Sequence, residues 1–313
     1  MPVLRINAGK DALEAHGQPG PVDPLLRKAL RGTGPIVVMV HGYKFAPGHA
    51  GACPHDHILS LDPPGTCWKA LSWPRQLGFG TDRGDEGLAI AFGWRARGSI
   101  WRAYREAEIA GHALARLVEA LGRLAPHRPV HALAHSLGAR VVLSALPQLS
   151  AGRLGRVILL AGAEYSTRAA AALDSPAGRA AEIFNVTSRE NDLFDFLLER
   201  LIAPPRRGDW ALGQLMPARP NTLTVQMDHP ATLQALRAAG FAIAPTAARV
   251  CHWSGYLRPG VFDFYRALLR EPARLPLRPL RAALPDRPDP RWSRILAAPA
   301  LHPPLPSGRR ASS

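Results

Sequence analysis

The sequence predicts an α/β fold, a doubly wound and mostly parallel sheet with helices on both faces. Two observations predict it: short apolar, β-branched runs recur along the chain, and helical patterns separate them. Strands that are covered on both faces read as continuous apolar runs, and their alternation with helices implies parallel crossovers. The runs that we expect to be strands are residues 35–40, 87–92, 129–134, 156–161, 182–187 and 222–227.

The clearest helix follows Ser99. From Ile100 to Leu121, apolar residues recur at spacings of three and four, which places them on one face of a long amphipathic helix. Shorter helical patterns cover residues 137–146, 192–202 and 261–271. The sequence shows no internal repeat.

Two segments interrupt this alternation. Residues 44–80 are rich in Pro, Gly, His and Trp and are too long for an ordinary βα loop, so we expect a lid or a pocket wall. Residues 272–313 form a Pro- and Arg-rich tail, for which we expect an extended or disordered structure. We therefore assign the folded domain to residues 1–271.

Composition excludes several classes of protein. The chain of 313 residues has a net charge of +15, but its Arg residues are scattered and no nucleic-acid-binding motif accompanies them, so we expect no specific nucleic-acid partner. Its 3 Cys are too few for a disulfide scaffold. No apolar run reaches the ~18 residues of a membrane span, and the first residues do not resemble a secretory signal. A cytoplasmic location follows as the default expectation, while the oligomeric state stays open.

Metal-capable side chains gather within the insertion, at Cys53, His55, Asp56, His57 and Cys67. Their order and spacing match no standard zinc pattern. We expect a polar loop at a pocket mouth, with neither a metal nor a cofactor.

The most informative motif is Ala134-His135-Ser136-Leu137-Gly138, where an apolar strand ends and a helical pattern begins. A tight strand-to-helix turn that exposes a nucleophilic Ser needs small residues two before and two after it. Gly138 meets this need, and Ala134 adds one methyl group to the more usual Gly. The competing interpretation is that Ser136 only caps the helix.

The first expected strand ends at His41-Gly42-Tyr43. A loop at this place in such a sheet supplies a backbone N–H to an oxyanion. We expect the N–H groups of Tyr43 and Leu137 to be the two donors, with Gly42 as the alternative to Tyr43.

An acid is expected after the strand at 182–187, in Ser-Arg-Glu-Asn-Asp. The order Ser, acid, His along the chain favours Asp192, which closes the loop and opens a helix. Glu190 and Asp195 are the rivals, and Asp192 could instead be a simple helix cap.

The base is expected at His252, in Val-Cys-His-Trp-Ser-Gly-Tyr before a helix. His229 is the competitor, although Asp-His-Pro is more typical of a turn before a helix. Either could be a structural histidine.

With these residues assembled, the chain resembles the α/β-hydrolase superfamily, and more narrowly a bacterial group of largely uncharacterised, serine esterase-like hydrolases. The resemblance covers roughly residues 35–269. It rests on these matches: Val-His-Gly-Tyr at 40–43, Ala-Phe-Gly-Trp at 91–94 with Tyr104, Ala-His-Ser-Leu-Gly-Ala-Arg at 134–140, Asn-Asp at 191–192 and His-Trp-Ser-Gly-Tyr at 252–256. In that group a Trp-Pro pair is common, whereas Arg95 follows Trp94 here.

The resemblance implies Ser136, Asp192 and His252 as nucleophile, acid and base, no cofactor, and cleavage of a small-molecule ester or thioester through an acyl-enzyme. Amides belong to the same class of substrate. It does not imply an individual substrate, because the fold hosts many. The alternative from another class is a catalytically silent fold of this type that binds a partner.

Overall fold

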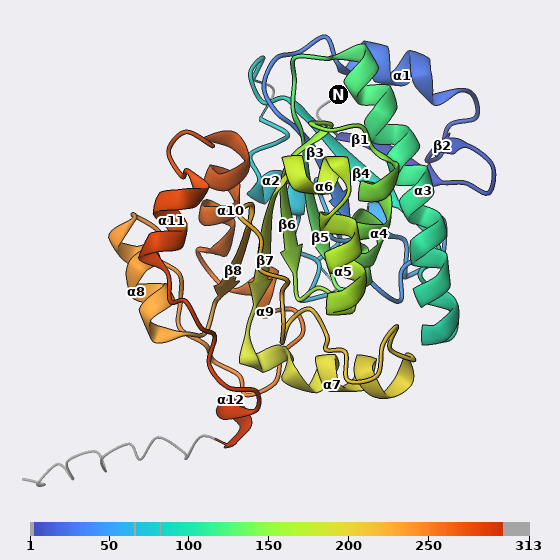
Figure 1. The fold of residues 1–313 in the computed structure, drawn as a ribbon. Helices are drawn as coiled ribbons and strands as arrows, with labels where there is room; N and C mark the ends of the chain where they lie inside the picture. The colour runs from blue at the N-terminus through green and yellow to red at the C-terminus, as the bar shows by residue number, and fades with distance from the viewer. Residues whose placement is uncertain (1–2, 66, 82, 297–313) are drawn as a thin grey trace, which may run out of the picture.

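The computed structural model describes residues 3–65, 67–81 and 83–296, and within them the strands form one sheet in the order β2-β1-β4-β3-β5-β6-β7-β8 (Figure 1). β1 and β2 pair antiparallel, and the other neighbouring strands pair parallel. The strands are β1 (Val3–Ala8), β2 (Leu13–Ala15), β3 (Ile36–Val40), β4 (Leu88–Gly93), β5 (Val130–His135), β6 (Leu154–Leu160), β7 (Glu182–Thr187) and β8 (Thr222–Gln226). The predicted fold class is confirmed.

Helices cover both faces of the sheet. Figure 1 shows α3, α4 and α5 on one side and α10 and α11 on the other. The helices are α1 (Val22–Ala29), α2 (Trp73–Gln76), α3 (Ile100–Leu124), α4 (Leu137–Ala145), α5 (Ser166–Leu173), α6 (Pro176–Ala180), α7 (Asp192–Leu201), α8 (Pro230–Ala238), α9 (Ser254–Leu257), α10 (Val261–Arg270), α11 (Leu277–Ala283) and α12 (Ser293–Leu296). None of these described helices combines the length and apolarity needed to cross a bilayer.

The central strand β3 is apolar throughout because it contributes to two cores. In β3, Ile36, Val38 and Val40 pack into the core beneath α3 and α4. Val37 and Met39 pack into the opposite core, with α10 and α11. The six expected strands correspond to β3–β8, and only β1 and β2 were not anticipated, because polar Arg5 and Asn7 interrupt the apolar pattern of β1.

The described part of the insertion at 44–80 is packed against the sheet. Ile58, Trp73 and Phe79 are fully buried in the second core. The Trp73 ring contacts His135 and Tyr256 edge-on. This segment therefore forms a wall beside the carboxyl ends of the strands.

The first part of the tail differs from the expectation of an extended or disordered chain. Within residues 272–296, α11 forms and Leu277 and Leu280 are buried in the second core. Arg156 of β6 donates to the carbonyls of Pro272 and Leu275. The Pro-rich composition concealed four apolar side chains that pack together: Leu275, Leu277, Leu280 and Leu284. Residues 297–313 lie outside the described residues.

The packed tail can be tested by truncating one leucine. Leu280 is 5% exposed, so Leu280→Ala is expected to lower the free energy of unfolding by about 2–3 kcal/mol through lost burial and a residual cavity. Leu296, in the same segment, is 79% exposed, so Leu296→Ala should change it by less than about 0.5 kcal/mol. Urea unfolding of both variants measures this, and equal small effects would mean that the tail does not pack.

Candidate active site

Ser136 occupies a strained turn between β5 and α4. Its backbone has φ 57° and ψ −127°, a conformation that non-glycine residues rarely adopt. A Cβ atom on Gly42 would lie 2.7 Å from Cβ of Ser136, and one on Gly138 would lie 2.5 Å from the carbonyl oxygen of Val40. Both glycines are therefore required by close approach between the Ser136 turn and the end of β3.

His252 lies beside Ser136, from a loop that precedes α9. Nε2 of His252 is 2.9 Å from Oγ of Ser136. Two contacts hold the loop: Nε2 of His135 lies 2.9 Å from the His252 carbonyl, and the N–H of Cys251 donates to the carbonyl of Glu190 at 2.9 Å. The ring of Phe194 stacks on the imidazole with centroids 4.5 Å apart. The structure thus brings two of the predicted residues together.

Asn191 lies at the other ring nitrogen of this histidine. Nδ1 of His252 is 2.6 Å from Oδ1 of Asn191, the last residue of the 3₁₀ helix η3 (Arg189–Asn191). The amide nitrogen of Asn191 donates to Asp195 at 2.9 Å, and Gln214 donates to the other oxygen of Asp195 at 2.6 Å. Because an amide oxygen only accepts, the proton of the neutral imidazole lies on Nδ1, and Nε2 is free to accept from Ser136.

Asp192, the expected acid, does not contact His252. This geometry corrects the expectation that Asp192 orients the imidazole. Its buried carboxylate accepts from Gln214 at 2.8 Å and from the N–H of Trp292 at 2.7 Å, and it pairs with Arg189 at 3.2 Å. Successive residues of a helical turn point about 100° apart. Asn191 and Asp192 consequently face different sides of the same turn.

The rival residues are placed elsewhere. The carboxylate of Glu190 pairs with Arg258 and accepts from Ser188. His229 caps α8 and lies 3.6 Å from Asp289. Asp195 reaches the imidazole only through Asn191. Sequence reasoning missed Asn191, and its only signal was its position next to the expected acid.

Burial dominates the electrostatics of these groups. It lowers the pKa of His252 well below its ordinary value, and electrostatic interactions with His135 and Lys69 lower it further. The imidazole is therefore neutral at pH 7, as a proton acceptor must be. Burial also raises the pKa of Asp195 to about 7, against the opposing effect of the Gln214 hydrogen bond.

The loop that carries Tyr43 is held by His41 and Trp94. The backbone N–H of Trp94 donates to Nε2 of His41 at 3.0 Å, and its indole N–H donates to the His41 carbonyl at 2.9 Å. Burial lowers the pKa of His41 to about 4, so this ring stays neutral and keeps Nε2 as an acceptor. Within the described chain, no hydrogen-bond acceptor is found for the N–H of Tyr43 or Leu137, the two expected oxyanion donors.

A buried ionic cluster supports the turn from the other side. Arg140 of α4 pairs with Glu164, which also accepts from the hydroxyl of Tyr104 in α3. The same loop presents the N–H of Ala163, which donates to the Ser136 carbonyl at 3.0 Å. This cluster therefore connects α3 and α4 with the loop that contacts the Ser136 turn. Removing one partner of the buried ion pair would leave the other charge uncompensated and would destabilise this connection.

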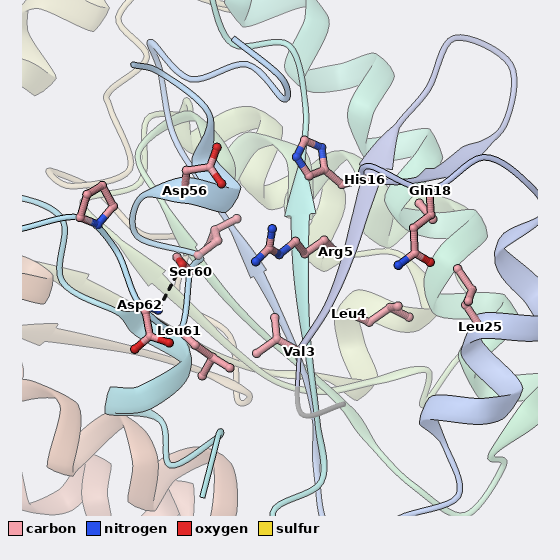
Figure 2. Close-up of a pocket in the computed structure, with 13 residues that line it drawn as sticks. Val3, Leu4, Arg5, His16, Gln18, Leu25, Asp56, Ser60, Leu61 and Asp62 are labelled. Carbon is pink, nitrogen blue, oxygen red and sulfur yellow. Dashed lines mark hydrogen bonds between the residues drawn. The ribbon is translucent and has the colours of Figure 1, made fainter. Parts of the chain in front are cut away.

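Ser136 and His252 open into a pocket of about 470 Å³. Most of its wall is apolar, and it opens between the loop after β3, the insertion and α7. Its lining residues are Gly42, Tyr43, Lys44, Phe45, His57, Ile58, Lys69, Ile100, His135, Ser136, Leu137, Ala163, Phe194, Leu197, Leu198, Leu201, His252, Trp253 and Tyr256. A second pocket, of about 560 Å³, lies near β1 and α1 and shares none of these residues (Figure 2).

Comparison with known proteins finds a family model that matches part of the chain. Residues 25–161, which include β3 to β6 and the Ser136 turn, match the model of a family described as an alpha/beta hydrolase of unknown function (DUF900). No curated protein shows significant similarity to the chain. The sheet order and the strained Ser136 turn are consistent with the α/β-hydrolase fold, and residues 25–161, which are less than half of the chain, match this family.

Proposed function

We propose that this protein is a serine hydrolase that cleaves a carboxylic ester or thioester by acyl transfer. The observation that carries the proposal is the continuous contact from Oγ of Ser136 through the imidazole of His252 to Asn191. A nucleophile with its base in hydrogen-bond reach, and the base oriented by a third group, is the arrangement that nucleophilic catalysis requires. The fold alone would not support this function.

In the first step, Oγ of Ser136 bonds to the substrate carbonyl carbon, and its proton passes to Nε2 of His252. The N–H groups of Tyr43 and Leu137 stabilise the oxyanion. The acyl C–O or C–S bond then breaks as His252 gives this proton to the leaving atom. In the second step, His252 accepts a proton from water, the resulting hydroxide equivalent attacks the acyl carbon, and Ser136 regains its proton as the acid leaves.

Asn191 takes the third role, which we expected for Asp192. Its neutral amide holds Nδ1 of His252 in the productive tautomer. Asp195 lies behind it and accepts from the Asn191 amide nitrogen. Hydrogen bonds in such a chain polarise one another, so an ionised Asp195 makes the Asn191 oxygen a better partner for the imidazolium.

The nucleophile is tested with a fluorophosphonate probe and a panel of esters. Wild-type protein should be labelled at Ser136, and Ser136→Ala should lose the label and at least about ten-thousandfold in kcat. Mass spectrometry maps the label, and circular dichroism checks the fold of the variant. If the folded wild type takes no label, the chain is a silent binding scaffold.

The third residue is tested by two neighbouring substitutions. Asn191→Ala removes the acceptor at Nδ1 of His252, so kcat/KM is expected to fall about a hundredfold or more. Asp192→Asn removes the charge beside Arg189, and should mainly lower stability while kcat/KM stays within about threefold. Steady-state kinetics and urea unfolding measure both, and the reverse pattern would restore Asp192 as the acid.

The pH dependence tests Asp195. Its pKa of about 7 means that the carboxylate loses its charge as the pH falls through 7, whereas His252 stays neutral there because its own pKa is well below the usual value. The kcat/KM of the wild type should therefore decline several-fold below about pH 7. Asp195→Asn should abolish this decline, whereas Asp192→Asn should only shift it toward lower pH, because the charge of Asp192 contributes to the raised pKa of Asp195. An identical profile for the Asp195→Asn variant would exclude the role of this carboxylate.

A further inference from the structure

The largely apolar pocket at Ser136 is lined by two positively charged side chains. The chain contains only four lysines, at positions 10, 28, 44 and 69, and two of them line this pocket. No Asp or Glu is among its lining residues. In the described part of the chain, neither Lys44 nor Lys69 forms an ion pair with a carboxylate. A positive field in the pocket is therefore left without a counter-charge from its own wall.

Lys69 is the better positioned of the two. This half-buried side chain lies over the ring of Trp253, with Nζ 3.5 Å from the ring centroid, and 5.2 Å from that of Trp68. The two indoles contact each other edge-on at 5.7 Å, and Trp68 is 68% exposed. A cation held on aromatic faces keeps its N–H donors available to a further partner, because the rings accept none of them strongly.

Lys69 lies on the side of the pocket where the leaving group of the substrate is expected. It lies over the ring of Trp253, which directly follows His252 in the chain. In acyl transfer, the imidazole delivers its proton to the leaving oxygen or sulfur. The leaving group therefore lies on the His252 side of the pocket, where Lys69 stands.

The remaining wall is suited to an apolar chain. Ile100 and Phe194 line the pocket together with Leu197 and Leu201, one turn apart on α7. Leu197 is 41% exposed and Leu201 is 42% exposed, so the apolar wall continues from the pocket to the protein surface. A long acyl chain could bury this exposed surface at roughly 25 cal/mol per Å² of apolar area.

We propose that the substrate is an anionic amphiphile: an ester or thioester with an apolar acyl chain along α7, whose leaving alcohol or thiol carries a carboxylate or phosphate bound by Lys69. This inference rests on the hydrolase function proposed above. The bond that breaks is the acyl C–O or C–S bond, and the negative group departs with the alcohol or thiol.

The hydrolysis test uses two matched esters, 4-carboxyphenyl octanoate and its neutral methyl ester, 4-(methoxycarbonyl)phenyl octanoate. Lys69→Gln should lower kcat/KM for the anionic ester about fivefold relative to the neutral one, the size expected for a half-exposed charge pair. Lys69→Arg should restore the preference. Lys28→Gln removes the same charge from an exposed site on α1 and controls for the net charge of the protein.

A binding test separates this inference from the hydrolase function. The ether 4-(octyloxy)benzoate cannot be cleaved, and its binding to Ser136→Ala protein is followed by tryptophan fluorescence beside its neutral amide. The benzoate should bind more tightly, and adding Lys69→Gln should raise its Kd about fivefold while adding Lys28→Gln leaves it unchanged. The corresponding phenyl phosphate shows which anion is preferred.

The outcomes are distinct. Equal binding of the benzoate, the phosphate and the neutral amide, or equal effects of Lys69→Gln and Lys28→Gln, overturns the anionic substrate. Selective binding through Lys69 without hydrolysis of any ester supports the anionic ligand and removes the hydrolase function. Hydrolysis that depends on Ser136 but ignores the charge of the leaving group supports the hydrolase function alone.

Discussion

The close approach of the Ser136 turn to the end of β3 is the constraint on which the site depends. Gly42 touches Ser136 and Gly138 touches the Val40 carbonyl, so a methyl group at either position would force the two strand ends apart. The strained backbone of Ser136 persists because the surrounding structure holds it on three sides. Its N–H donates to Leu160 of β6, its carbonyl accepts from Ala163, and α4 begins at the next residue. The geometry of Ser136 is thus a property of three adjacent strands rather than of one motif.

Burial explains why the polar groups around this turn are so extensively paired. His41 and His135 are buried, His252 is half-buried, and desolvation lowers the pKa of each. Each ring is therefore neutral and has a defined donor and acceptor, which fixes orientation without adding charge. His135 holds the carbonyl of His252, and His41 holds the loop of Tyr43 through Trp94. His135 consequently supports the geometry of His252, and His41 supports that of the loop carrying Tyr43.

Asp192 illustrates how a residue next to a site can serve the fold. Its carboxylate pairs with Arg189 and accepts from the N–H of Trp292, near the end of the described chain. It therefore connects the loop after β7 with the C-terminal segment. Gln214 donates to both Asp192 and Asp195, which joins this structural contact to the chain of hydrogen bonds that ends at His252. Asp192 therefore supports the fold, whereas Asp195 contacts the imidazole of His252 through Asn191.

Local sequence patterns were enough to predict the parallel sheet, the long helix after Ser99 and the position of Ser136, and they favoured His252 over His229 as its neighbour. These features depend on local patterns: apolar runs for strands covered on both faces, and small residues around a tight turn. The choice between Asn191 and Asp192 needed the folded structure, because one residue changes the direction of a side chain by about 100° in a helical turn and the sequence pattern does not record that angle. The folded structure likewise decided that residues 272–296 pack, since four leucines among prolines become a core only when β6 and α10 supply the opposite surface.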